Sequence, residues 1–354
     1  MNRMRVVITA AASLNPYAVL FTRSIQQADP AIECELWRGG VSWRRLLGPD
    51  RPHILHVHWV ELLYRHFAPL YIRLPFWLST MSAMAAARLR GVKIVYTVHN
   101  VWQHESEGQS LYRLAHHILL RLASAVHVHN DAARDELVRS AGRTLPVVVI
   151  PHGSYVNWYP NECSRREARE RLGLSAESFV YLSLGHMRAY KGREDLMRAF
   201  AGLAGEEEVL LLAGGVQQPD FEARLRGQAA TDPRVRLFLD YVPDDDVQVF
   251  MNAADVAVLP YRQVTTSGTG ILALSFGLPV VAPALGPFPE LLGHGAGILY
   301  DPMKPEALAW GLRKARQADL APMRQAAWAM AQGLDWEPIG QQLATLYRRT
   351  VEAG

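Results

Sequence analysis

The stretch PYRQVTTSGTGILALSFGLPVVAPALGPFPE, from Pro260 to Glu290, decides the fold assignment of this chain. An apolar run over 256–259 ends just before it, and a cluster of small residues occupies 265–270. The apolar segment 271–276 is then closed at Gly277, with a proline two residues later. This order is typical of a strand, a loop, a helix and a second strand, and it predicts a helix that begins at a small-residue loop.

The start of this predicted helix suits a bound anion. Small residues leave backbone N–H groups open to a ligand, and the helix dipole adds partial positive charge, which favours a phosphate. An ordinary capped helix without a ligand gives the same pattern, so that alternative stays open on this stretch alone. The candidate phosphate-binding residues are Thr266, Ser267, Gly268, Thr269 and Gly270.

A second stretch, YLSLGHMRAYKG over 181–192, strengthens the phosphate interpretation. Its apolar strand stops at Gly185, and Arg188 and Lys191 follow on the turn into a helix. Cations at the carboxyl end of a strand are well placed to neutralise a diphosphate through charge-assisted hydrogen bonds. A solvated turn is the alternative interpretation of such an Arg/Lys pair.

Several short motifs follow this G-x-x-R-x-x-K-G sequence in a defined order. They are Ala213-Gly214-Gly215, Tyr241-Val242-Pro243, Ala254-Asp255, Leu259-Pro260, the Gly277–Ala282 segment and Glu290. Together they resemble the donor domain of GT-B glycosyltransferases, most closely the broad glycosyltransferase family 4. The pattern is closer still to bacterial transferases that build xanthan-like exopolysaccharide repeat units on a lipid diphosphate.

The resemblance implies a complete architecture and a set of roles. The fold would be α/β of the GT-B type, with two Rossmann-like, doubly wound parallel-sheet domains facing a cleft. We expect an N-terminal acceptor domain over 1–160, a donor domain over 161–335, and a C-terminal helix over 336–354 that crosses back to the first domain. Tyr241 and Val242 would lie at the nucleotide base, and Glu290 would orient the loop or the donor.

The sequence departs from the family at two positions. The family usually has two Glu residues, eight apart, in the small-residue loop and the helix after it, and here these positions are Val264 and Leu272. The usual contacts to the ribose and the donor sugar cannot be carried over. Retention of the anomeric configuration is therefore in doubt, and we predict an inverting transfer.

The N-terminal half alternates predicted strands and helices, which indicates a parallel sheet covered on both faces. Strands are predicted at 6–9, 53–58, 92–98, 125–129 and 147–150, and helices at 17–27 and 111–123. Ligands lie beyond the carboxyl ends of such strands. The acceptor-side candidates at these ends are His58, Trp59, Glu61 and His152.

An inverting reaction needs a base for the acceptor hydroxyl. Glu105 is the first choice and Asp131 the second, with His104 and Glu61 as further alternatives. His99, at a strand end, matches the family histidine that touches the donor sugar, although a simple structural role is possible for it.

Composition limits the remaining classes of function. A net charge of +3 carries no signature of nucleic-acid binding, and two cysteines make no disulfide framework, so the reducing cytosol is the expected compartment. Thirteen histidines include the same-face pairs 56/58 and 127/129, but no carboxylate or Cys completes a metal-ligand spacing. We expect no metal and no other cofactor. The apolar run near the N-terminus, 6–12, is interpreted as a first strand, with a signal peptide as the alternative.

The segment 64–90 interleaves aromatic residues with Arg65, Arg73, Arg88 and Arg90. Its uncharged run, 74–87, is too short to span a bilayer, so the segment is either an interfacial membrane contact or a buried helix with a basic rim.

The leading hypothesis is a Leloir glycosyltransferase peripheral to the cytoplasmic face of the membrane. It would move a hexosyl unit from GDP-mannose or a UDP-sugar to a lipid-linked oligosaccharide. A sugar-nucleotide 2-epimerase and a non-catalytic sugar-nucleotide-binding subunit are the alternatives. A dehydrogenase is disfavoured because no G-x-G-x-x-G follows the first strand.

Overall fold

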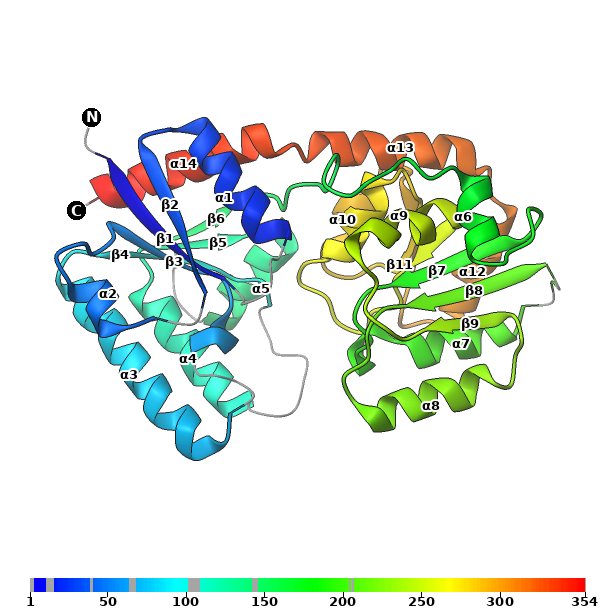
Figure 1. The fold of residues 1–354 in the computed structure, drawn as a ribbon, viewed down its shortest axis with the longest axis horizontal. Helices are drawn as coiled ribbons and strands as arrows, with labels where there is room; N and C mark the ends of the chain where they lie inside the picture. The colour runs from blue at the N-terminus through cyan, green and yellow to red at the C-terminus, as the bar shows by residue number, and fades with distance from the viewer. Residues whose placement is uncertain are drawn as a thin grey trace. The chain divides into compact units, whose positions relative to one another are not determined.

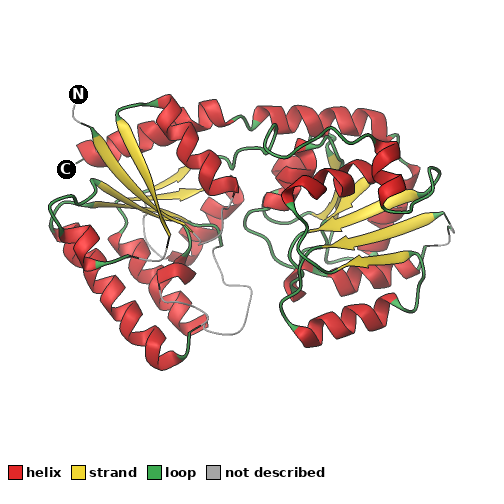
Figure 2. Cartoon of the chain, viewed as in Figure 1, coloured by secondary structure: helices red, strands yellow, loops and turns green. Residues whose placement is uncertain are grey.

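The computed structural model describes residues 3–10, 16–38, 41–63, 68–100, 109–141, 146–203, 205 and 207–353. The chain forms two compact units, each built around one parallel sheet with helices on both faces (Figures 1 and 2). The first unit contains Met1–Gly153 and Asp335–Gly354, and the second contains Ser154–Leu334.

The first unit contains a six-stranded sheet with the order β2-β1-β3-β4-β5-β6, in which all pairs are parallel. The strands are β1 (Met4–Ala10), β2 (Ile32–Arg38), β3 (Ile54–Val57), β4 (Lys93–Thr97), β5 (Ala125–Val128) and β6 (Val147–Val149). The helices are α1 (Pro16–Ala28), α2 (Trp43–Leu47), the short η1 (Val60–Leu63), α3 (Leu70–Leu89), α4 (Gln109–Leu122), α5 (Asp131–Ala141) and α14 (Trp336–Glu352).

Apolar side chains occupy both faces of this sheet, because successive strand residues point to opposite faces, and helices pack against each face. Val6 and Ile8 pack with α1 and α14, whereas Val7 packs with the helices α2 to α5. The amphipathic C-terminal helix is thus part of the first unit. Its Arg348 binds Asp29 at the end of α1, with Nη2 2.5 Å from Oδ2.

The second unit contains a six-stranded parallel sheet with the order β12-β11-β10-β7-β8-β9. The strands are β7 (Phe179–Leu184), β8 (Glu208–Ala213), β9 (Val235–Phe238), β10 (Val256–Val258), β11 (Val280–Pro283) and β12 (Gly297–Tyr300). The helices are α6 (Arg165–Arg171), η2 (Ala189–Lys191), α7 (Arg193–Ala201), α8 (Pro219–Ala229), α9 (Asp244–Ala253), α10 (Gly268–Ser275), α11 (Phe288–Leu292), α12 (Ala307–Gln317) and α13 (Leu320–Gly333).

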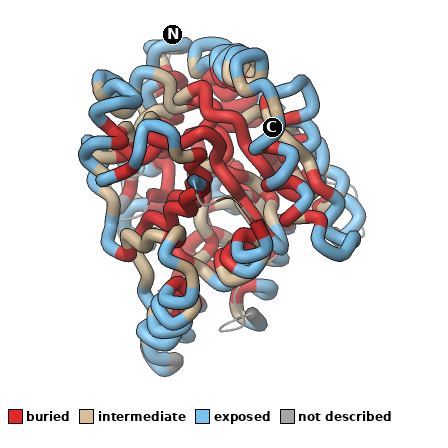
Figure 3. The backbone as a smooth tube through the Cα atoms, turned by 90° about the vertical axis from the view of Figure 1, so that its right-hand side faces the viewer, coloured by how far each residue is buried: buried red, intermediate tan, exposed pale blue. Residues whose placement is uncertain are grey.

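The second sheet is also buried on both faces, one covered by α6, α9, α10, α11 and α13 and the other by α7, α8 and α12. In Figure 3 the interior segments are buried and the outer helical turns are exposed. Strands buried on both faces read as continuous apolar runs rather than alternating ones, which is why 179–184 and 208–213 are so apolar.

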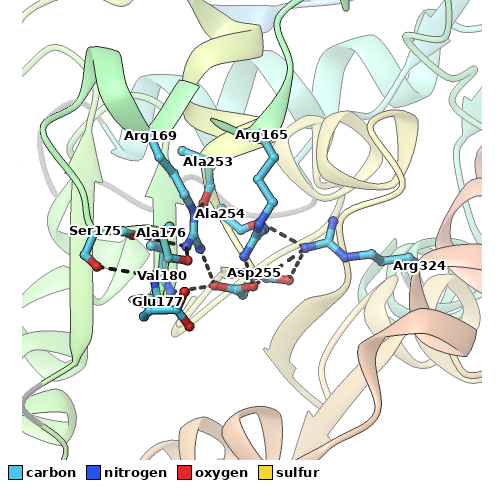
Figure 4. Close-up of polar contacts among 10 residues, drawn as sticks. All are labelled: Arg165, Arg169, Ser175, Ala176, Glu177, Val180, Ala253, Ala254, Asp255 and Arg324. Atoms are coloured by element: carbon cyan, nitrogen blue, oxygen red, sulfur yellow. Dashed lines mark hydrogen bonds and ion pairs between the residues drawn. The ribbon is translucent and has the colours of Figure 1, made fainter. Parts of the chain in front are cut away.

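Asp255, just before β10, connects three elements of the second unit through hydrogen bonds and ion pairs (Figure 4). Its carboxylate accepts hydrogen bonds from Arg169 Nη2 at 2.9 Å, from Arg165 Nη2 at 2.5 Å and from the backbone N–H of Val180 at 2.8 Å. Arg324 of α13 donates to the Ala254 carbonyl at 3.0 Å. A single carboxylate therefore joins α6, β7 and β10.

The structure differs from the sequence expectations in two local places. Residues 157–171, predicted as a polar connection, end in α6, whose start is fixed by a capping box between Ser164 and Glu167. Strand β2 was not among the predicted strands, although Ile32, Cys34 and Leu36 alternate with Glu33 and Glu35 as in a half-buried edge strand. Among the described helices, none is long and apolar enough to cross a membrane.

The strand order of each sheet indicates where a ligand would bind. Chain order reverses between β7 and β10 in the second sheet, and between β1 and β3 in the first. In doubly wound sheets, ligands bind outside the carboxyl ends of the strands at such reversal points. The loops after β7, β10 and β3 are therefore the candidate ligand-binding loops.

Candidate active site

The two loops at the reversal point of the second sheet meet at Gly185. This glycine has a φ of +109°, and a Cβ added there would lie 3.2 Å from Thr269 Oγ1 and 3.6 Å from Lys191 Nζ. The small-residue loop after β10 and the cationic loop after β7 are thus in contact. Gly185 is required because an L side chain would be strained and would fill the space between them.

The predicted helix start at the small-residue loop is confirmed. Helix α10 begins at Gly268, and the Ser267 hydroxyl caps it by accepting a hydrogen bond from Gly270 N at 3.0 Å. Within the described part of the chain, the N–H groups of Gly268 and Thr269 have no acceptor, and the buried Thr266 Oγ1 has no partner. Unsatisfied donors at a helix start are the groups that bind an anion.

Arg188 and Lys191 lie on the facing loop. Arg188 Nη2 donates to Gln217 Oε1 at 2.7 Å, and Lys191 Nζ lies 5.5 Å from the centroid of the Tyr261 ring. Burial lowers the pKa of Lys191; Tyr261 opposes this shift, and the charges of Arg193 and Arg188 add to it. An anion bound here would oppose this lowering, because a nearby negative charge favours the ammonium form.

Tyr241 and Val242 follow β9 and line a hollow of ≈ 390 Å³. The Tyr241 side chain is 67% exposed, and its hydroxyl donates to Asp244 Oδ1 at 3.2 Å. Phe238 and Phe250 contribute to the same lining. Contact of Tyr241 and Val242 with a nucleotide base stays a prediction.

Glu290 lies exposed in the first turn of α11. The segment before it is held against the small-residue loop, because a Cβ on Gly286 would lie 2.2 Å from the Val264 carbonyl oxygen. Gly286 has a φ of +52°, so both its conformation and its close approach favour glycine. The role assigned to Glu290 stays a prediction.

At the reversal point of the first sheet, four aromatic rings gather. His58 follows β3 and His99 follows β4, and His58 Nδ1 lies 3.1 Å from His99 Nε2. Trp59 stacks on His99 with ring centroids 5.0 Å apart, and the ring of Tyr17 contacts all three. The Nε2 atom of His58 is buried and has no partner among the described residues.

A chain of hydrogen bonds runs through the interior behind these rings. Tyr347 OH lies 2.6 Å from His56 Nδ1, His56 Nε2 lies 2.7 Å from Thr97 Oγ1, and Thr97 Oγ1 lies 2.8 Å from His127 Nδ1. His127 Nε2 donates to the Ile150 carbonyl at 2.9 Å. With both imidazoles neutral, Tyr347 donates to His56 and the Ile150 carbonyl accepts from His127, while His56, Thr97 and His127 each donate one hydrogen bond and accept one.

His129 and His152 complete the histidine cluster, which consists of His56, His58, His99, His127, His129 and His152. The same-face pairing of 56 with 58 and of 127 with 129 is confirmed by ring centroids 4.3 and 4.6 Å apart. Burial lowers the pKa of His127 and His152 to about 4 and lowers the pKa of the other four as well. Within the described ranges, no three His, Cys, Asp or Glu side chains converge as a metal site.

The base candidates have different surroundings. Asp131 is the exposed first residue of α5, with Oδ1 2.5 Å from Arg134 Nη1. Glu61 is half-buried in η1. Glu105 and His104 lie outside the described residues. The assignment of the base stays a prediction.

Comparison with known proteins identifies the family. The "Glycosyl transferases group 1" model matches residues 164–329, and the "Glycosyl transferase 4-like domain" model matches residues 5–153. A GDP-mannose:glycolipid 4-beta-D-mannosyltransferase of Xanthomonas campestris is 30% identical over 322 residues, covering 86% of this chain and 81% of the relative. The chain belongs to the group 1 glycosyltransferases.

Other similar proteins are also glycosyltransferases or share the fold. A D-inositol 3-phosphate glycosyltransferase of Catenulispora acidiphila is 27% identical over 300 residues, covering 78% of this chain and 72% of that protein. Sucrose-phosphate synthase of Thermosynechococcus elongatus matches with a TM-score of 0.77 at 18% identity, covering 99% of this chain and 100% of that one. Anabaena HepE, solved with UDP and glucose, matches with 0.77 at 19%, covering 98% and 100%. These structural likenesses show the GT-B fold.

The departure from the usual carboxylate pair has a structural basis in this glycosyltransferase. Leu272 is 7% exposed and packs in the apolar core beneath α10, and Val264 packs against the same core. A carboxylate at position 272 would have to leave this packing to reach a ligand, because an unpaired buried charge is costly. The two positions that usually carry the carboxylates are thus occupied here by apolar residues that pack in or against the core.

Three residues that line these sites were not recognised from the sequence. Tyr17 lies in the middle of the histidine rings, Tyr261 lies beneath Lys191, and Arg193 is buried behind Gly185. The only sequence signal for Arg193 was its place directly after the K-G motif. Tyr17 gave none beyond the apolar face of its helix.

Proposed function

We propose that this glycosyltransferase moves a hexosyl unit from a nucleoside diphosphate sugar to a lipid-linked saccharide. The observation that carries the proposal is the meeting of Thr269 and Lys191 at Gly185, which offers a hydroxyl, helix N–H groups and an ammonium to one anion. A leaving diphosphate develops negative charge in the transition state, and such fixed donors stabilise it. Arg188 would add a second cation.

The donor and acceptor classes rest on relatives. The Xanthomonas relative is named for GDP-mannose and a glycolipid, and the Anabaena structure holds UDP and glucose. We infer a GDP- or UDP-sugar donor and a glycolipid acceptor for this chain. The relative's name also records a β-linked mannosyl product, which is inversion if its donor is α-linked. This supports the proposal that the transfer inverts, with Glu105 or Asp131 as the base.

The α3 helix supports contact with a membrane surface. Its exposed apolar side chains Tyr71, Leu74 and Leu78 recur at helical spacing, and Tyr71 is 77% exposed. Arg88 and Arg90 lie at the end of the same helix. An exposed apolar stripe beside cations is the chemistry of an interfacial helix on anionic lipid. We propose that the protein acts at the inner face of the cell membrane through this helix.

A donor screen tests the proposed function. Purified protein is incubated with GDP- and UDP-sugars, with and without a saccharide linked to a lipid diphosphate, and nucleoside diphosphate release is measured. Release that requires the acceptor supports glycosyl transfer. Release without an acceptor, accompanied by a free epimerised sugar, indicates the epimerase instead. Binding of a donor without any release under all conditions indicates a non-catalytic subunit.

A further inference from the structure

Arg193, the first residue of α7, is a fully buried arginine without a counter-charge. It is 0% exposed, and its Nη2 donates to the carbonyl oxygens of Leu184 and Gly185, each at 3.3 Å. Its Nε and Nη1 atoms have no hydrogen-bond partner among the described residues. Arginine stays protonated at neutral pH even when burial lowers its pKa, so a full positive charge lies behind the Gly185 loop.

The acidic residues nearest in sequence do not neutralise this charge. Glu194 pairs with Arg224, with Oε1 3.1 Å from Nε. Asp195 pairs with Arg262, with Oδ2 2.7 Å from Nη2, and also with Arg198. Across the described residues, no carboxylate forms an ion pair with Arg193. Buried charges are normally paired, so this one is an exception that calls for a partner not supplied by the protein.

The surroundings of Arg193 point to the diphosphate site. Its charge and that of Lys191 both act on the Tyr261 phenol, and the hydroxyls of Thr269 and Ser267 at the start of α10 interact with that phenol as well. Arg193, Lys191, Tyr261 and the α10 start therefore form one continuous group around Gly185. This group has two positive charges and no acid among its described members.

We propose that Arg193 is a positioning residue that strengthens diphosphate binding from behind the Gly185 loop; this inference rests on the donor site of the proposed function. It acts in two ways. Its charge adds to that of Lys191 at short range, where burial limits screening by solvent. Its bonds to the Leu184 and Gly185 carbonyls hold these oxygens away from the anion, so that the phosphate meets donors instead of acceptors.

The alternative is that Arg193 only ties the end of β7 to α7. The two roles predict opposite effects on the protein without ligand. An unpaired buried charge costs stability, so its removal should leave the melting temperature unchanged or raise it. A purely structural tie should lower the melting temperature when it is lost, and it should leave anion affinity unchanged once the protein is folded.

The test uses Arg193→Gln, which keeps a donor to the carbonyls but loses the charge, and Arg193→Lys, which keeps the charge. Arg198→Gln is the matched control, because Arg198 lies exposed on the same helix. Binding of inorganic pyrophosphate and of GDP and UDP is measured by calorimetry at about 0.05 and 0.3 M salt. Melting temperatures are measured with and without ligand.

We expect Arg193→Gln to weaken pyrophosphate binding about tenfold, to reduce its salt dependence, and not to lower the melting temperature of the free protein. Arg193→Lys should restore most of the affinity, and Arg198→Gln should match the wild type. If Arg193→Gln binds like the wild type, or lowers only the melting temperature, the role of Arg193 is structural and the inference is overturned. A wild-type protein that binds neither pyrophosphate nor any nucleoside diphosphate would overturn the proposed function together with it.

Discussion

Acidification should destabilise the first unit, because its buried histidines stay neutral in the folded state at pH values where the unfolded chain binds protons. In the unfolded chain each histidine has a pKa of about 6.5, whereas burial lowers that of His127 and His152 to about 4. A folded pKa below the unfolded one means that stability is complete above the unfolded value. It is then lost as pH falls from about 6.5 towards 4.

The size of the effect follows from these two residues. Within that window each histidine contributes a slope of about 1.4 kcal/mol per pH unit, so at about pH 5 the two together remove about 4 kcal/mol. His56, His58, His99 and His129 shift in the same direction and add to this loss. Since a domain is stable by only about 5–15 kcal/mol, we expect the first unit to open under mildly acidic conditions.

Urea unfolding followed by circular dichroism at about pH 7.5, 6 and 5 measures the slope, and hydrogen exchange corrected for pH locates the opening. Protection should fall first in β3, β4 and β5. His127→Gln should be less stable at neutral pH but should show a shallower slope, whereas the exposed His117→Gln should keep the wild-type slope. A stability that is constant over this range, or first opening in the second unit, would refute the reasoning.

Three further predictions concern the proposed function. Arg188→Ala and Lys191→Ala should each abolish turnover and weaken nucleoside diphosphate binding at least tenfold while circular dichroism stays unchanged. The reason is that each variant loses a cation that would neutralise the leaving diphosphate. Wild-type kinetics in both variants would refute the donor-site assignment. Co-sedimentation with anionic liposomes should fall when the arginines of the segment 64–90 (Arg65, Arg73, Arg88 and Arg90) are replaced by Glu, since like charges repel. Binding that is unchanged or never present would leave α3 as a surface helix. The product should have the opposite anomeric configuration to the donor, read from its NMR coupling, and a retained configuration would contradict inversion. Glu105→Gln or Asp131→Asn should lower kcat about a hundredfold or more. Full activity in both variants would exclude both residues as the base.

The loops of the proposed donor site were predictable as structural elements because their signals are local. The small residues 266–270, the strand end at Gly185 and the cations Arg188 and Lys191 all reflect backbone geometry and charge over a few residues. A helix start with a Ser cap, or a glycine at positive φ, is written in the residues that adopt it. The order of these motifs was also enough to suggest the family that the comparisons then identified.

What the sequence by itself determined is therefore the type of most elements and which residues stand at the strand ends. The tertiary structure alone decided which of these ends meet. Strand order brings His58 and His99 together and seats Tyr17 among them, and it joins Tyr347 of the last helix to His56 in β3. Burial could not be predicted from the sequence either. Arg193 follows a turn of a type usual at the surface, yet the folded protein buries it completely. The physical reason is that periodicity and caps depend on neighbours along the chain, whereas burial, pKa and ring contacts depend on residues tens to hundreds of positions away.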